Sequence, residues 1–341
     1  MRILATLIAG VLLAACGGAA GSPAAIGGSF GPTPSPTSSP APTTTPKPTA
    51  TPVATIGEPA DDGARVVKVT AAGRKRDLTI ESPAVGVVKV RLLVPREFDA
   101  QPTTRWPAFY LLHGADGSHL DWTDSTDVAK LTEPIDMVVV MPDAGELGFY
   151  SDWWNGGRGG IPMWETFHLV ELPQLLDKNW HVSEARVVAG LSMGGYGAIE
   201  YAARKPGMFL AAASYSGVLD TVGGKLDIGT EDLWGNPVEQ SDIWKAHNPL
   251  DLASALKGTP LYVSYGDGTP GPFDKGYVSP DDLEGWIAAQ NKTFVARLAV
   301  LKIPATVDAY GPGAHDWPYW ERALQRSLPM LLKALGVKAA S

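Results

Sequence analysis

The sequence predicts an α/β fold in which helices cover both faces of a doubly wound, mostly parallel sheet. From about Ala64 onward, short β-rich segments alternate with helical patterns, as in chains built from β-α-β units. Several of these segments are apolar on both faces, as expected of parallel strands buried under helices. The chain has 341 residues and is 45% hydrophobic, so it has enough apolar material for one large core.

The alternation predicts seven strands and four helices. The strands are expected at residues 87–94, 108–112, 137–141, 186–190, 211–216, 260–265 and 305–310. The helices are expected at residues 164–179, 193–205, 280–300 and 317–335. The stretch 217–257 shows neither period and is interpreted as an irregular insertion near the site.

The first residues resemble an export signal. Arg2 provides a positive charge, and residues 3–12 form an apolar run of about ten residues, far short of the roughly 20 that a bilayer-spanning helix needs. The small residues before Cys16 resemble the bacterial lipobox, in which the cysteine is lipidated. We therefore predict a lipoprotein signal peptide at residues 1–16; the alternative is an ordinary secretory signal with an accidental cysteine. Cys16 is the only cysteine, so the chain cannot form an internal disulfide.

A low-complexity segment follows at residues 17–62. Between Pro32 and Pro52, 8 prolines and 7 threonines fill 15 of 21 positions. Such a segment buries too little apolar surface to offset its ordering entropy, so we expect a disordered tether. It would span about 40 Å as a flexible coil and up to roughly 140 Å when extended. The folded domain is predicted at residues 63–341.

The charge balance argues against a nucleic-acid partner. The formal net charge is -8 and the pI is near 5.3, and there is no basic stripe to neutralise phosphates. The sequence predicts contact with a membrane instead, through the lipid on Cys16.

The segment Gly190-Leu191-Ser192-Met193-Gly194 matches the pattern Gly-x-Ser-x-Gly. The pattern is short enough to occur by chance, but here it joins the buried strand expected at residues 186–190 to a helical pattern. A strand-to-helix turn of this kind strains the serine and exposes its hydroxyl at a helix N-terminus. This context favours an α/β-hydrolase fold with Ser192 as nucleophile; the alternative is a glycine-rich turn with an idle serine.

The serine needs a base, because its hydroxyl is a weak nucleophile until its proton is removed. In α/β-hydrolases the acid and then the histidine follow the serine, and only His247 and His315 do so here. His315 lies in a glycine-rich loop between the last expected strand and the last expected helix, where the base belongs. His247 is interpreted as a surface or packing histidine.

Two carboxylates are candidates for the acid that orients the histidine. Asp267 directly follows an expected strand, and Glu284 opens an expected helix 31 residues before His315 (315 − 284). Either residue type can fix the imidazole tautomer and stabilise the imidazolium. Position alone favours Asp267.

An oxyanion hole requires two backbone N–H groups aimed at the developing negative charge. Met193, which follows the nucleophile, is expected to provide one of them. The second is expected from the loop at residues 113–117, directly after the strand expected at residues 108–112.

Several separated segments resemble the mycobacterial mycolyltransferases of the antigen 85 complex, within the wider esterase D-like group. They run in the same order over roughly residues 108–325. They are Phe149-Tyr150-Ser151-Asp152-Trp153, Trp164-Glu165-Thr166-Phe167, Glu171-Leu172-Pro173-Gln174, the elbow, Leu233-Trp234-Gly235, Gly268-Thr269-Pro270, Leu283-Glu284-Gly285, Asn291-Lys292-Thr293-Phe294 and His315-Asp316-Trp317-Pro318-Tyr319-Trp320.

The resemblance implies an acid and a second oxyanion donor. In that family the catalytic glutamate lies in the segment that matches Glu284, and the position that matches Asp267 is an asparagine. The implied triad is therefore Ser192, His315 and Glu284. The implied second donor is Ala115, and no cofactor is implied.

One loop departs from the family pattern. His113 and Asp116 stand where the mycolyltransferases use an aspartate and an arginine to hold trehalose. Because an arginine's fork of donors is replaced by an acceptor, the trehalose site cannot be carried over.

Aromatic residues are numerous, with eleven tryptophans in the chain. Trp153 and Trp317 flank motif segments and are predicted to line a site for an acyl chain or a sugar face; the alternative is that they are core aromatics. Glu165 and His168 have a helical spacing seen in metal ligands, but no third ligand follows, so no metal site is expected.

The sequence therefore supports two hypotheses. The first is an exported serine esterase or acyltransferase that acts on acylated sugars or lipids. The second is a non-catalytic surface protein for binding or adhesion that has kept a hydrolase fold. Intact Ser192 and His315 favour the first.

Overall fold

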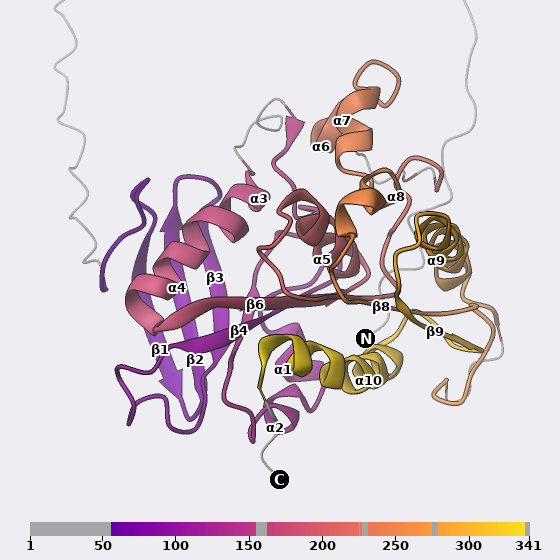
Figure 1. Cartoon of the computed structure of the whole chain (residues 1–341). Coiled ribbons are helices and arrows are strands. Elements are labelled where there is room, and N and C mark those ends of the chain that lie inside the picture. The colour runs from indigo at the N-terminus through magenta and orange to yellow at the C-terminus, as the bar shows by residue number, and fades with distance from the viewer. Residues whose placement is uncertain (1–55, 155–161, 225, 227–230, 275–278, 338–341) are drawn as a thin grey trace, which may run out of the picture. The chain divides into compact units, whose positions relative to one another are not determined.

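The computed structural model describes residues 56–154, 162–224, 226, 231–274 and 279–337. The predicted signal peptide, Cys16 and most of the predicted tether lie outside these residues. The described chain forms a nine-stranded sheet with the order β1-β2-β3-β5-β4-β6-β7-β8-β9 (Figure 1). The strands are β1 (Arg65–Ala72), β2 (Lys75–Ser82), β3 (Gly86–Leu93), β4 (Trp106–Leu112), β5 (Val138–Pro142), β6 (Val182–Leu191), β7 (Ala212–Tyr215), β8 (Leu261–Gly266) and β9 (Thr306–Gly311).

The pairing confirms the predicted sheet. Strand β4 pairs in parallel with β5 and β6, and the series continues in parallel through β7 and β8 to β9. Each of the seven expected strands is present. Because parallel strands point the same way, their carboxyl ends meet at one edge of the sheet, where open α/β sheets place their sites.

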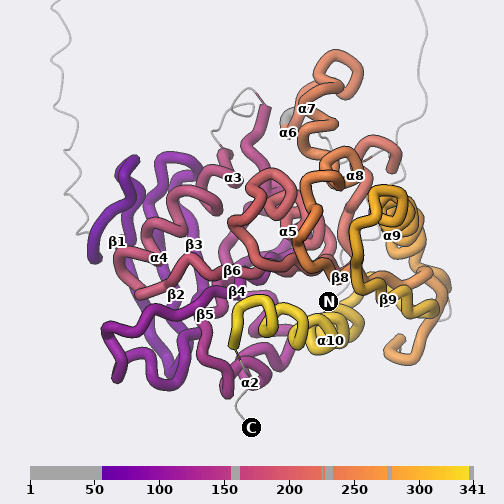
Figure 2. The backbone as a smooth tube through the Cα atoms, viewed as in Figure 1, coloured from indigo at the N-terminus to yellow at the C-terminus, as the bar shows by residue number. Residues whose placement is uncertain are grey.

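Strands β1 and β2 were not predicted. They pair antiparallel with each other, and β2 also pairs antiparallel with β3, at the opposite edge of the sheet from β9 (Figure 2). Exposed positions are frequent in β1 and charged residues are frequent in β2, so neither strand shows the continuous apolar run of a buried strand. Gly73, with φ +58°, lies in the turn that joins them.

Helices cover both faces of the sheet, as predicted. Helices α4, α5 and α9 lie on one face, and α1, α2 and α10 lie on the other (Figure 1). The expected helix at residues 164–179 is interrupted by a π-helical turn, Phe167–Glu171. The helices are α1 (Asp121–Ser125), α2 (Val128–Leu131), α3 (Trp164–Thr166), α4 (Leu172–Trp180), α5 (Met193–Arg204), α9 (Asp282–Val300) and α10 (Trp317–Leu335).

The stretch at residues 217–257 is less irregular than expected. Its described residues form three short helices and a 3-10 turn (Figure 2), of which α8 and the 3-10 turn pack against α5 and α9. Segments of four to six residues are too short to display a period in the sequence. They are α6 (Glu231–Trp234), α7 (Ser241–Ala246), α8 (Pro249–Leu252) and the 3-10 turn Ala253–Leu256.

Among the described residues, no helix combines the length and the apolar character that a bilayer span requires.

Candidate active site

Ser192 occupies a strained turn between β6 and α5. Its φ is +52° and its ψ is -120°, a conformation that L-residues other than glycine rarely adopt. A Cβ at Gly190 would lie 2.3 Å from the carbonyl oxygen of Gly194, and a Cβ at Gly194 would lie 2.5 Å from that of Leu112. The close backbone approach therefore requires glycine on both sides of the serine, as the motif predicts.

The structure places His315 next to Glu284. His315 Nδ1 lies 2.7 Å from Glu284 Oε2. The other oxygen of this fully buried glutamate accepts hydrogen bonds from Ser216 Oγ at 2.8 Å and from the Gly266 N–H at 2.6 Å. With three donors around it, the carboxylate acts as an acceptor, so Nδ1 of His315 carries its proton and Nε2 is left to accept one.

Each member of this group follows a parallel strand at its carboxyl end. Ser216 follows β7, Gly266 ends β8, and Glu284 lies in the first turn of α9 after that strand. His315 follows β9, and the edge of its ring packs against Trp320 at 4.9 Å between centroids. The group is therefore assembled from three strand ends that are far apart in the sequence.

Asp267 does not contact the histidine. It is exposed, and its Oδ1 accepts a hydrogen bond from the backbone N–H of Thr269, two residues further on. Its own N–H donates to the carbonyl of Gly311. Asp267 therefore shapes the loop after β8, while the deeper Glu284 reaches the imidazole.

The loop after β4 lies against the serine. A Cβ at Gly114 would come within 3.4 Å of Ser192 Cβ. His113 is buried; its Nε2 accepts a hydrogen bond from the Ala144 N–H at 2.9 Å, so its Nδ1 donates to the Gly114 carbonyl at 2.7 Å. Burial lowers the pKa of His113 and so favours this neutral form.

The hydrogen bond from His113 to the Gly114 carbonyl also orients a predicted oxyanion-hole donor. The Gly114 carbonyl and the Ala115 N–H belong to the same planar peptide, so holding one orients the other. Met193 is the first residue of α5, and its N–H has no partner within the helix. Met193 directly follows the serine and Ala115 directly follows Gly114, which lies against the serine, so the two N–H groups remain the predicted donors.

The two tryptophans predicted to line the site are half-buried. Trp317 packs edge-on against Trp122 at 5.3 Å and against Trp320 at 5.2 Å. Trp153 donates from its indole to the Gly148 carbonyl. Trp317 therefore extends the aromatic packing next to His315, and Trp153 belongs to the loop before α3.

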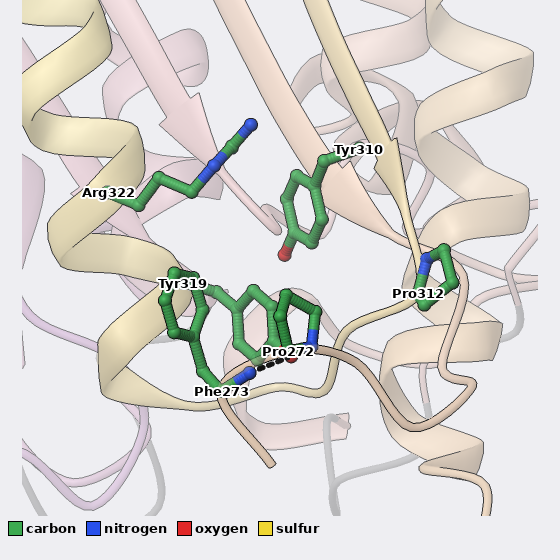
Figure 3. A pocket seen from close by; sticks show the side chains of 6 residues that line it. All are labelled: Pro272, Phe273, Tyr310, Pro312, Tyr319 and Arg322. Carbon is green, nitrogen blue, oxygen red and sulfur yellow. Dashed lines mark hydrogen bonds between the residues drawn. The ribbon is translucent and has the colours of Figure 1, made fainter.

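A pocket of about 230 Å³ opens beside the loop that leads to His315 (Figure 3). The rings of Tyr310 and Tyr319 stack there at 5.3 Å with an interplanar angle of 7°. Neither Ser192 nor His315 lines it. The lining residues are Pro272, Phe273, Tyr310, Pro312, Tyr319 and Arg322.

A second cluster of polar side chains lies between α3, α5 and α7. Ligand-capable atoms of Glu165, Glu200 and His247 lie within 4.8 Å of one another. Arg204 Nε is 2.9 Å from Glu165 Oε2 and 3.1 Å from Glu200 Oε1. The guanidinium already supplies positive charge at this position, which disfavours a metal cation there. His168, the other residue with metal-ligand spacing, bonds instead to Tyr201 and the Asp143 carbonyl.

The sequence did not predict Ser216 or Gly266 as partners of the glutamate. Both lie at the ends of expected strands, and this position is the one sequence feature that could have indicated them. Ser216 also has φ +47°, a strain that a sequence does not display.

The fold and the strained serine turn define an α/β-hydrolase. A family model described as Putative esterase matches residues 86–331, and the chain belongs to this family. Members of the family are acyl-ester hydrolases and acyltransferases, and the chain has this activity class.

Relatives of known description support the same class. The chain is 32% identical over 251 residues to a diacylglycerol acyltransferase/mycolyltransferase Ag85B of Mycolicibacterium smegmatis, covering 67% of this chain and 77% of that protein. It is also 32% identical over 252 residues to the Ag85A protein of Mycobacterium tuberculosis, covering 67% and 74%. The resemblance to the antigen 85 mycolyltransferases is therefore confirmed.

Solved structures confirm the fold. MPT51 (FbpC1) of Mycobacterium tuberculosis superposes with a TM-score of 0.63 at 23% identity, covering 77% of this chain and 100% of that chain. An S-formylglutathione hydrolase from Agrobacterium tumefaciens superposes with a TM-score of 0.65 at 16% identity, covering 80% and 99%.

Proposed function

We propose that Ser192, His315 and Glu284 form a catalytic triad for acyl transfer to water or to a second alcohol. The observation that supports this triad is the hydrogen bond between His315 Nδ1 and Glu284 Oε2. It orients the imidazole and leaves Nε2 with the lone pair that a general base needs.

In the first step, His315 Nε2 removes the proton from Ser192 Oγ as this oxygen attacks an ester carbonyl carbon. The N–H groups of Met193 and Ala115 stabilise the tetrahedral oxyanion. The bond to the alkoxy oxygen then breaks, and His315 returns the proton to the departing alcohol. In the second step, water or another alcohol gives its proton to His315 as its oxygen attacks the acyl carbon. The bond from that carbon to Ser192 Oγ then breaks, and His315 returns the proton to Ser192 Oγ.

We propose acylated sugars or lipids as the substrates. The names of the 32%-identical relatives refer to acyl transfer involving diacylglycerol and mycolate. Half-buried aromatic rings such as Trp153 and Trp317 suit an apolar chain or a sugar face.

The triad proposal is tested by turnover of a p-nitrophenyl ester. We expect Ser192→Ala to lower kcat by at least about 10³-fold, because removal of a nucleophile in such triads leaves only binding and oxyanion stabilisation. Ser183→Ala, on the same strand β6, serves as the matched control and should retain wild-type kcat.

Equal rates for wild type and Ser192→Ala would overturn the triad and would favour the non-catalytic binding protein. A phosphonate inhibitor adds a positive readout: its mass should be found on the peptide that contains Ser192 and on no other.

We also propose that the protein is exported and anchored to the outer face of the cell membrane through a lipid on Cys16. The residues before Cys16 and the proline-rich segment after it support this location. Mass spectrometry of the mature protein should find Cys16 as the first residue with acyl groups attached, and Cys16→Ala should remove the acyl mass. A mature chain that lacks Cys16, or carries it unmodified, would contradict the anchor.

A further inference from the structure

One carboxylate connects the two segments that hold Glu284 and His315. Asp281 is the N-cap of α9, and its Oδ1 accepts a hydrogen bond from the Glu284 N–H at 3.1 Å. Its other oxygen, Oδ2, accepts a hydrogen bond from the backbone N–H of His315 at 2.8 Å. The same side chain therefore contacts the main chain of both Glu284 and His315, and His315 lies 34 residues after Asp281 in the chain.

We propose that Asp281 is a positioning residue for the triad, on the assumption that the proposed function is correct. It holds the loop that contains His315 against the first turn of the helix that contains Glu284. The hydrogen bond between their side chains then forms between two backbones whose separation is already set. Asp281 contacts no reacting atom and acts through its two neighbours.

The backbone of Asp281 is itself held in place. Its N–H donates to the Gly268 carbonyl at 2.6 Å, and its carbonyl accepts from the Gly285 N–H at 3.0 Å. A Cβ at Gly268 would come within 2.4 Å of the Asp281 carbonyl oxygen. The loop after β8 and the first turn of α9 thus fit together closely, so the backbone that carries the Asp281 carboxylate is held in place.

The loop after β9 needs this contact near its end. Its first part is tied to the loop after β8, because Asp267 N–H donates to the Gly311 carbonyl and Gly268 N–H to the Gly313 carbonyl. These bonds end two residues before His315. The Asp281 carboxylate is the hydrogen-bond acceptor that the structure gives to the His315 N–H itself.

Both carboxylate oxygens are required for this role. Asparagine caps a helix about as well as aspartate, so Asp281→Asn keeps an acceptor for the Glu284 N–H. Its second atom is an NH2 group, which cannot accept from an N–H. With one acceptor oxygen the side chain can bond to only one of the two N–H groups, so the substitution breaks the link between the two segments.

Asp316→Asn provides the matched control. Asp316 is the N-cap of α10, a helix of the same length of 19 residues, and its Oδ1 accepts from the Trp317 N–H at 2.7 Å. It is exposed and caps its helix without bridging to a second segment. Any general cost of an Asp-to-Asn change at a helix cap should appear in both variants.

We expect Asp281→Asn to lower kcat by about 10- to 100-fold, because small displacements of catalytic groups have effects of this order, and to leave KM within about 2-fold. Asp316→Asn should keep kcat within about 2-fold of wild type. The downfield proton NMR resonance of the Nδ1–H···Oε2 bond should shift or broaden in Asp281→Asn and stay unchanged in Asp316→Asn.

Wild-type kcat in Asp281→Asn would overturn the proposal, as would a lowered kcat with an unchanged Nδ1 proton resonance, which would indicate a purely structural role. Ser192→Ala in the same assay distinguishes failure of the positioning role from failure of the triad. If Ser192→Ala is inactive and Asp281→Asn is normal, only the positioning role fails; if Ser192→Ala is as active as wild type, the triad fails and the positioning role with it.

Discussion

Two histidine–glutamate pairs lie in the described chain, and the bond within each pair is similar. His315 Nδ1 is 2.7 Å from Glu284 Oε2, and His247 Nδ1 is 3.0 Å from Glu200 Oε1. Both glutamates are fully buried. The bond distance and the burial of the glutamate alone therefore do not distinguish the proposed His315–Glu284 pair from the His247–Glu200 pair.

The groups around the two carboxylates differ. Ser216 and Gly266 donate to the free oxygen of Glu284, whereas Oε2 of Glu200 has no hydrogen-bond partner among the described residues. Burial, followed by the nearby carboxylate of Glu165, raises the pKa of Glu200 well above its ordinary value of 4.5. Glu200 therefore favours its protonated, neutral form.

Burial and a neighbouring charge keep the His247 imidazole neutral. Burial, followed by the positive charge of Arg204, lowers the pKa of His247 from 6.5 to about 3. Its ring stacks on Trp234 at 5.5 Å with an interplanar angle of 11°. The neutral imidazole therefore packs between the short helices and α5, which agrees with the interpretation of His247 as a packing histidine.

The surroundings of the two pairs, and not the bond within each pair, distinguish the proposed catalytic pair from the packing pair. A pair suited to catalysis needs a carboxylate whose remaining lone pairs are satisfied, so that it can stabilise an imidazolium. It also needs a position at the carboxyl ends of the parallel strands, which Glu284 and His315 occupy.

The largest expected difference is in turnover. Glu284→Gln should lower kcat by about 10³- to 10⁴-fold, because an amide cannot stabilise the imidazolium as a carboxylate does. Glu200→Gln should keep kcat within about 3-fold, because glutamine has the shape and neutrality of the protonated acid already there. Steady-state kinetics on a p-nitrophenyl ester measures both.

Asp267→Asn is the control for this prediction and should keep kcat within about 2-fold, because an asparagine oxygen still accepts from Thr269. If Asp267→Asn were inactive and Glu284→Gln fully active, the assignment of the acid would be reversed. A loss of turnover in Glu200→Gln comparable to that in Glu284→Gln would remove the distinction between the two pairs.

A smaller effect is expected in the pH dependence of stability. Above pH 4.5 the raised pKa of Glu200 makes the native state bind more protons than the unfolded chain, and below pH 6.5 the lowered pKa of His247 makes it bind fewer. Between these pH values the two residues therefore contribute to the slope of the free energy of unfolding in opposite directions, and their contributions offset each other.

Each single substitution should leave only one of the two opposing contributions to the pH dependence of stability. In Glu200→Gln only the lowered pKa of His247 remains, so the unfolded chain binds the extra proton and stability falls as the pH is lowered below 6.5. In His247→Asn only the raised pKa of Glu200 remains, so stability falls as the pH is raised above 4.5. Each slope should change by up to about 1.4 kcal/mol per pH unit, in opposite directions.

Urea denaturation at several pH values between 4.5 and 6.5 measures these slopes. His168, whose pKa burial lowers to about 3, provides the same acid-sensitive background in all three proteins. If the slopes change in the same direction in both variants, or change in neither, the raised pKa of Glu200 and the lowered pKa of His247 would be contradicted.

Much of the fold could be predicted because its signals are local. Seven of the nine strands show as β-rich segments, and the turn at Ser192 is specified within five residues by the need for glycine at positions 190 and 194. Strands β1 and β2 escaped because neither has a continuous apolar run. The helices α6 to α8 escaped because each is only one to two turns long.

The acid could not be chosen from position alone. Asp267 stands at the more usual place directly after a strand, but its carboxylate turns back onto its own loop. Glu284 reaches His315 from inside the first turn of α9. The family resemblance indicated Glu284, whereas no local pattern indicated its partners Ser216 and Gly266.

The local sequence predicted seven of the nine strands and the turn at Ser192, because close backbone approach and apolar burial depend on neighbouring residues. The groups that surround each histidine–glutamate pair could be found only in the tertiary structure. Hydrogen bonds such as those of Asp281 join segments that are 34 residues apart, and burial sets the charge state of each pair only after those segments have come together.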